Sequence, residues 1–138
     1  MDLKSLTYTS LANLDLTADD LHDIHRTARE HNAIDGITGL LVFNGNRFLQ
    51  IIEGAAPAID DLLARLRRDP RHSGLEVRDE RMVAARSFPD WSMELVRVSA
   101  GYFEARDTIQ VCVPATVSGE VRDLLLRMTE QISGTVQL

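Results

Sequence analysis

The stretch from Ile37 to Glu53 reads ITGLLVFNGNRFLQIIE, and it decides the fold. Two runs rich in large apolar residues flank Asn44-Gly45, which is the strongest short-range signal for a β-hairpin. The spacing predicts strands over 37–43 and 48–53. Side chains alternate along a strand, so the second strand divides into a face with Phe48, Gln50 and Ile52 and a face with Arg47, Leu49, Ile51 and Glu53. Gln50 therefore stands between two large apolar neighbours.

Helical periodicity appears on both sides of this hairpin. Thr17 predicts a helix start, as an N-cap followed by acidic residues in the first turn. The stripe that follows has helical spacing and consists of Leu21, Ile24, His25 and Ala28. Asn32 lies on the same face, so a polar amide ends an apolar stripe. Pro57 suits the first turn of a second helix, which should end before Pro70 and whose stripe is Ile59, Leu62, Leu63 and Leu66.

Strand patterns over 3–10, 75–85 and 94–98 complete the element order. This order is typical of a ferredoxin-like βαββαββ sandwich of the α+β class, a five-stranded mixed sheet with two helices on one face. We expect the first and third strands to be parallel neighbours at the sheet centre. Tyr8 and Gln50 would then lie on adjacent strands, within hydrogen-bond reach if both face the helices.

The C-terminal part has a different pattern. Residues 102–115 fit either a short helix or a strand. Ser118 predicts the cap of a last helix, whose apolar face consists of Val121, Leu124, Leu125, Met128 and Ile132. This face should pack on the free side of the sheet or against a second subunit. We therefore expect residues 1–98 to form one domain and residues 99–138 a helical extension packed on it.

Composition excludes several classes of protein. The 138 residues carry 15 basic and 21 acidic side chains, a net charge of −6. This acidic balance gives no overall attraction to nucleic acids or anionic membranes, although a local basic patch stays open. The single cysteine, Cys112, excludes an internal disulfide and a multi-cysteine zinc site, and we interpret it as a core residue. His22 and His25 have no third metal ligand nearby, so we expect a solvated His22, a core-facing His25 and no metal. Without a signal-peptide pattern or a bilayer-spanning apolar run, a cytoplasmic protein is expected.

Three polar side chains converge on one predicted layer: Tyr8, Asn32 and Gln50. Between two helices and a sheet, such groups can line a slot for a flat, hydrogen-bonding heterocycle. The alternative is that they satisfy one another or a buried water, and the pattern alone favours this alternative. A basic run over 65–72 either attracts phosphate groups or is a solvated helix end, and no glycine-rich phosphate loop accompanies it.

Six segments within residues 1–98 occur in an order and spacing that carry a resemblance. They are YTSL at 8–11, HN at 31–32, GITGLL at 36–41, FLQIIEG at 48–54, DPRH at 69–72 and FPDWSM at 88–93. In these segments the chain resembles the BLUF family, the blue-light sensors that use flavin.

The resemblance implies a noncovalently bound FAD whose isoalloxazine ring lies between the two helices, with its edge toward the sheet. Tyr8 matches the redox-active tyrosine of the family, Gln50 its switching glutamine and Asn32 the amide that holds the polar edge of the ring. Further flavin contacts are implied at His31, Arg65, Asp69 and His72. The pair implicated in signal output corresponds to Trp91 and Met93.

The mechanism that the resemblance implies starts with light-driven electron and proton transfer from Tyr8 to the flavin. Gln50 then rotates or tautomerises, and the flavin ends oxidised with altered hydrogen bonds. We therefore expect a blue-light photoreceptor, not an enzyme, with no fused effector domain. It would signal to an unidentified partner protein, assemble as a homodimer or larger oligomer, and bind neither nucleic acid nor membrane.

Two alternatives from other classes stay open. One is an enzyme, either a flavin-dependent oxidoreductase or a small-anion hydrolase, although the arginine and asparagine that the hydrolase would aim at one anion site are not identified in the sequence. The other is an interaction module without a chromophore, in which the motif serves core packing alone.

Overall fold

The structure is a computed structural model that describes residues 2–13, 15–90, 92–97, 102–113, 117 and 119–132, without the side chains of residues 92, 102–106, 120 and 128–132. Its elements are β1 (Leu3–Ala12), α1 (Ala18–Asp35), β2 (Thr38–Phe43), β3 (Arg47–Ala55), α2 (Ala56–Arg68), β4 (His72–Val83), β5 (Ser92–Arg97), α3 (Tyr102–Cys112) and α4 (Gly119–Ile132). The predicted order of elements through β5 is confirmed.

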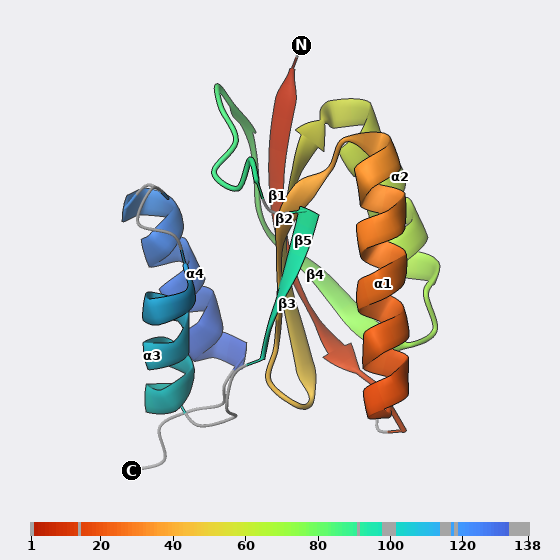
Figure 1. Ribbon diagram of the computed structural model, residues 1–138, viewed down its shortest axis with the longest axis vertical. Coiled ribbons are helices and arrows are strands. Elements are labelled where there is room, and N and C mark those ends of the chain that lie inside the picture. Colours follow the sequence, from red (N-terminus) through yellow and green to blue (C-terminus); the bar gives the residue numbers. More distant parts are fainter. Residues whose placement is uncertain are drawn as a thin grey trace.

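The strands form one five-stranded sheet in the order β4-β1-β3-β2-β5. β2 and β5 run parallel and the other neighbours run antiparallel, so the sheet is mixed, as predicted. Figure 1 shows α1 and α2 on one side of the sheet and α3 and α4 on the other. We call these sides the α1/α2 face and the α3/α4 face.

The predicted direction of the two central strands is wrong. β1 and β3 are neighbours, but they pair antiparallel, from Leu3 opposite Ala55 to Leu11 opposite Arg47. The physical reason lies in the connections between strands. The crossover through α1 returns β2 parallel to β1, and the tight hairpin then reverses the chain, so β3 must run against β1.

Each face of the sheet carries its own apolar core. On the α1/α2 face the buried cluster includes Leu6, Tyr8, Phe48 and Ile52 from the strands and Leu21 and Ile59 from the helices. On the α3/α4 face it includes Leu40, Val42, Leu49 and Ile51 from the strands and Ile109 and Leu125 from the helices. The predicted alternation along β3 is therefore confirmed, and Gln50 shares the α1/α2 face.

The helix boundaries follow the predicted signals. Thr17 caps α1 in a capping box, in which its hydroxyl accepts from the Asp20 backbone and the Asp20 carboxylate accepts from the Thr17 backbone. α1 ends at Gly36, whose φ of 68° is a left-handed conformation that favours glycine. α2 has Pro57 in its first turn and ends before Pro70, as expected.

The ambiguous segment after residue 101 forms the helix α3, and the interpretation of Cys112 as a core residue is wrong. Ile109 and Val113, four positions apart, are buried against the sheet. Cys112 and Val111 lie on other sides of the same helix and are exposed. A residue adjacent in sequence to a buried helical position is turned about 100° away from it, which accounts for the error.

The described part of the apolar stripe on α4 packs against its own sheet. Leu125 is buried and Val121 is partly buried there. The stripe therefore gives no separate support for a second subunit. The predicted cap Ser118, the output residue Trp91 and the side chains of Met128 and Ile132 lie outside the described residues.

Gly39 allows β2 and β3 to approach each other closely. Its φ is 153°, and a Cβ atom placed on it would lie 1.9 Å from the carbonyl oxygen of Ile51. Because backbone rather than a mobile side chain occupies that space, the strands themselves would have to move apart. This requirement accounts for the glycine in the middle of a strand that otherwise favours bulky residues.

We expect Gly39→Ala to lower the free energy of unfolding by about 3 kcal/mol or more, because the new methyl group would overlap the β3 backbone. Chemical denaturation followed by circular dichroism measures the change. Gly119→Ala is the matched control, since a Cβ there meets no atom within 4 Å. Equal stability of the two variants would contradict the close-approach argument.

Candidate functional site

A pocket of about 290 Å³ lies between α1, α2 and the sheet. Its size is at the lower end of the range for small-molecule sites, ~300–1,000 Å³. The walls include apolar side chains from both helices and the sheet, among them Ile24 of α1, Leu41 of β2 and Leu62 of α2. All seven residues for which the sequence predicted flavin contacts line this one pocket, namely Tyr8, His31, Asn32, Gln50, Arg65, Asp69 and His72.

Tyr8 and Gln50 form a hydrogen-bonded pair on the sheet wall of the pocket. They occupy directly opposite positions on β1 and β3, and both side chains are buried on the α1/α2 face. The Tyr8 hydroxyl donates to Gln50 Oε1 at 2.5 Å. The predicted contact between these two residues is confirmed, and it arises from strand register alone.

The other end of the Gln50 amide contacts β5. Gln50 Nε2 lies 3.1 Å from the sulfur of Met93, which is itself fully buried. Gln50 thus bridges a phenol on β1 and a thioether on β5. The amide oxygen accepts hydrogen bonds and the amide nitrogen donates them. A rotation of the amide would therefore turn the donor toward Tyr8 and the acceptor toward Met93.

Asn32 is the exception among the three polar residues. Its side chain is 1% exposed, yet neither the amide oxygen nor the amide nitrogen has a hydrogen-bond partner within the described part of the chain. Tyr8 and Gln50 satisfy each other, as one alternative expected, but Asn32 does not take part. A buried amide without partners costs about 1–3 kcal/mol per group, so this arrangement favours an external partner.

The rim of the pocket carries charged groups from α2 and the loop after it. Arg65 forms an ion pair with Asp35 at 3.2 Å, and its buried Nε has no partner within the described residues. Asp69 and Arg71 form a bidentate pair with contacts of 2.7 to 3.2 Å. Burial by itself would raise the pKa of the Asp69 carboxyl, but the hydrogen bonds from Arg71 hold that pKa below its usual value.

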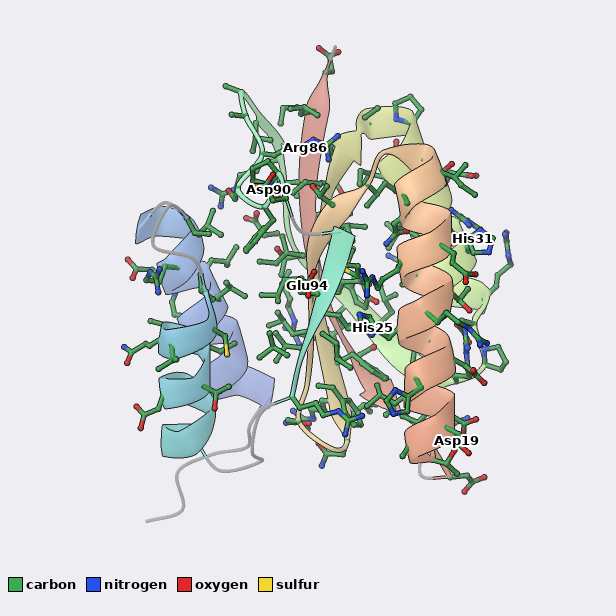
Figure 2. The ribbon with its side chains drawn as sticks, in the orientation of Figure 1. Asp19, His25, His31, Arg86, Asp90 and Glu94 are labelled. Atoms are coloured by element: carbon green, nitrogen blue, oxygen red, sulfur yellow. The ribbon has the colours of Figure 1, made fainter. Side chains whose placement is uncertain are left out.

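His72 is held in a fixed orientation at the start of β4. Its Nε2 lies 2.7 Å from the Leu66 carbonyl, which can only accept, so Nε2 carries a proton and donates. Its Nδ1 lies 2.8 Å from the Ser10 hydroxyl. The ring also meets Phe48 edge to face, with centroids 6.3 Å apart. His31, by contrast, is an exposed residue of α1 at the pocket rim (Figure 2).

Two pocket features are absent from the sequence prediction. Arg71 entered it only within the basic run and the DPRH segment, with no flavin contact assigned, although the side chain lines the pocket and orients Asp69. Ser10 entered it only within the first strand and the YTSL segment, although its hydroxyl contacts the pocket residue His72. A sequence signal existed for Ser10, because it shares the face of Tyr8 two residues away.

Comparison with known proteins agrees with this geometry. Residues 3–94 match the family model BLUF, described as sensors of blue light using FAD. The chain belongs to the BLUF family. Photoactivated adenylate cyclase subunit beta from Euglena gracilis is 36% identical over 92 residues, which is 66% of this chain but only 11% of that protein.

Solved structures of BLUF proteins share the fold. The dark-state structure of BlrB, a BLUF protein, has a TM-score of 0.72 and 36% identity, and the match covers 93% of this chain and 94% of that one. A structure titled BlrP1 BLUF has a TM-score of 0.81 and 28% identity, covering 100% and 96% of the two chains. This BLUF chain is therefore a blue-light sensor domain of a flavin-using family.

The loop between β4 and β5 is bound to the BLUF sheet by the side chains of Glu53 and Arg86. The buried Glu53 carboxylate accepts from the backbone N–H groups of Ser87 and Phe88, each at 2.8 Å. Arg86 donates in return to the carbonyl oxygens of Glu53 and Gly36, at 2.9 and 2.7 Å. Figure 2 labels Arg86 near the upper end of the sheet. Neither residue was predicted to have this role.

Two other expectations concern metals and membranes. Among the described residues of this BLUF protein, no group of three or more His, Cys, Asp and Glu side chains is placed to hold a metal ion. His22 is exposed and His25 is half-buried, as expected. Within the same residues, no helix is both long and apolar enough to cross a membrane.

The Tyr8 phenol generates a pH prediction for this BLUF domain. Burial, with a smaller contribution from the Asp69 carboxylate, raises the pKa of Tyr8 well above its ordinary value of 10.0. Above about pH 10 the unfolded chain loses this proton while the folded chain keeps it, so the free energy of unfolding falls as pH rises. We expect a smaller fall in Tyr8→Phe, measured by denaturant unfolding between about pH 9 and pH 11. Equal slopes in the two proteins would contradict a buried, protonated phenol.

Proposed function

We propose that this BLUF protein holds FAD noncovalently in the pocket between α1, α2 and the sheet, and acts as a light receptor rather than as an enzyme. The observation that carries the proposal is the Asn32 amide, buried without a hydrogen-bond partner in the described part of the chain. The edge of an isoalloxazine ring presents alternating carbonyl and N–H groups, which would satisfy both amide atoms.

The rest of the pocket suits the same ligand. Its apolar walls come from helices on one side and the sheet on the other, which favours a flat aromatic ring. Gln50 adds a second amide, and Tyr8 borders the ring site. At the rim, Arg65, Arg71 and His31 are the residues that we propose for the phosphate-bearing part of FAD, with Asp69 and His72 as supporting contacts.

When bound, an oxidised flavin absorbs blue light and then accepts an electron readily. Tyr8 is the donor that we propose, since its hydroxyl lies on the pocket wall and donates to Gln50 Oε1. Burial raises the pKa of Tyr8 further above its ordinary value, so the buried phenolate is disfavoured while the phenol is in its ground state. A phenol that loses an electron becomes strongly acidic, so the Tyr8 proton then moves toward Gln50 Oε1.

Gln50 converts this proton movement into a structural signal. The amide holds the Tyr8 hydroxyl with its oxygen and contacts the Met93 sulfur with its nitrogen. A rotation or tautomerisation of the amide changes both contacts at once. Met93 belongs to β5, so we propose that β5 and the helices that follow it form the two-state element that light biases, with Trp91 as a second output residue.

The output of the sensor passes to another protein. The Euglena relative is named as a cyclase subunit, and this chain matches a small share of it, so in that case the matched region is part of a longer enzyme. For this chain we propose a separate effector protein, a homodimer or larger oligomer as the assembly, and residues 1–98 as the flavin-binding domain with 99–138 as its helical extension. The lone cysteine, exposed on α3, suits the reducing cytoplasm.

The purified protein is expected to be yellow and to release FAD, rather than FMN or riboflavin, on denaturation. Mass spectrometry of the released pigment identifies it. A blue flash should shift the flavin absorption to the red, and the shift should reverse in darkness. A colourless protein would favour the interaction module, and lasting bleaching sustained by a reductant substrate would favour an oxidoreductase.

Gln50→Leu is expected to abolish the red shift while FAD binding persists, because leucine removes the switching amide and leaves Asn32 in place. Difference absorbance after a blue flash measures it. Tyr8→Phe should abolish or severely damage the photocycle, because it removes the hydroxyl that donates to Gln50 Oε1. The exposed Gln110 provides the matched control, since Gln110→Leu should respond like the unaltered protein. An unchanged photocycle in Gln50→Leu would refute the assigned role of Gln50.

A further inference from the structure

Met93 occupies an irregular position in β5. Gly39 of β2 pairs with Ser92 and the next residue, Leu40, pairs with Glu94, so Met93 is the extra residue of a bulge. Its φ of 79° is the only positive value at a non-glycine residue in the described part of the chain. A long side chain rarely adopts this conformation, so surrounding contacts must hold it there.

One contact that holds Met93 is visible at its side chain. The side chain is fully buried in the α1/α2 core, with its sulfur 3.1 Å from Gln50 Nε2. This contact is weak by itself, since a thioether is a poor hydrogen-bond acceptor. The bulge therefore needs a stronger contact on its backbone.

His25 supplies that contact from α1. Its Nε2 lies 2.9 Å from the Met93 carbonyl oxygen, and since a carbonyl only accepts, Nε2 carries the proton and donates. His25 is half-buried, and Figure 2 shows it beside β5 on the near side of α1. Asn32 lies two turns further along the same helix, so α1 carries both the unpaired pocket amide and the support of the β5 bulge.

We infer that His25 is a positioning residue that holds the Met93 bulge so that the thioether faces the Gln50 amide. The inference rests on the proposed function, in which the Gln50 amide is the element that light rearranges. In this proposal the resting arrangement is the one in which the Tyr8 hydroxyl donates to Gln50 Oε1 and Gln50 Nε2 lies against the Met93 sulfur. His25 stabilises this resting state through its hydrogen bond to the backbone of β5.

The kinetic test uses the flavin-loaded protein. In His25→Leu the resting arrangement loses one hydrogen bond, so the return from the light-adapted state should slow by about two- to tenfold, with the size of the red shift retained. His25→Gln restores an N–H donor of similar reach and should restore the rate. His22→Leu is the matched control, on an exposed residue of the same helix. A rate in His25→Leu equal to or faster than that of His22→Leu would overturn the inference.

A second measurement requires no photochemistry. With methyl-labelled methionine, the Met93 methyl signal in darkness should shift or broaden in His25→Leu and return in His25→Gln, assigned by its loss in Met93→Leu. If the unaltered protein shows no light response while this signal follows residue 25, the proposed function fails and the positioning role stands. If the Met93 methyl signal is the same in the unaltered protein, His25→Leu and His25→Gln, the positioning role fails whatever the photocycle does.

Discussion

The pairing of β1 with β3 is the constraint on which the site depends. Tyr8 stands directly opposite Gln50 in this register, and the hydrogen bond between their side chains follows from that placement. Because side chains alternate with a period of two, a slip of one residue would turn Gln50 toward the α3/α4 face. The apolar residues on both faces of β3 oppose such a slip, since it would exchange Phe48 and Ile52 with Leu49 and Ile51. The packing of two cores therefore secures the geometry of one polar pair.

Asn32 shows a conflict between folding and binding. An apolar residue at this position of α1 would complete the stripe and avoid an unsatisfied amide. The chain instead carries an amide that has no hydrogen-bond partner among the described residues. A ligand that binds the folded state alone adds to its stability, so a bound ring would offset the cost of the amide. The least favourable residue for the isolated core is thus the most informative one about function.

Local patterns predicted what local forces determine. The hairpin at Asn44, the alternation along β3 and the cap at Thr17 each depend on a few neighbouring residues, and each was confirmed. The convergence of the predicted site residues on one pocket followed from these elements together with the resemblance to known sensors. The family match and the neighbouring structures then established the sensor class without further geometry.

What sequence could not supply depends on contacts between distant segments. The bulge at Met93 arises from the pairing of β5 with β2, and the residues next to Met93 in the sequence do not predict it. The contacts of Arg86 join positions far apart in the chain. The direction of β3 does follow from the sequence, because a crossover followed by a hairpin requires β3 to run against β1, and the predicted parallel pair was wrong. The sequence did not predict which side of α3 is exposed, because its short apolar run fits more than one orientation of the helix on the sheet.

The attachment of the loop before β5 has an evolutionary consequence. Glu53 binds the N–H groups of the loop, and main-chain N–H groups are the same whatever residues carry them, proline excepted. The side chains of Ala84 and Ala85 are exposed and take no part in this attachment. Such positions can diverge freely among related sensors without loosening the segment. A receptor built this way can acquire new recognition partners at that surface while its photochemical interior stays the same.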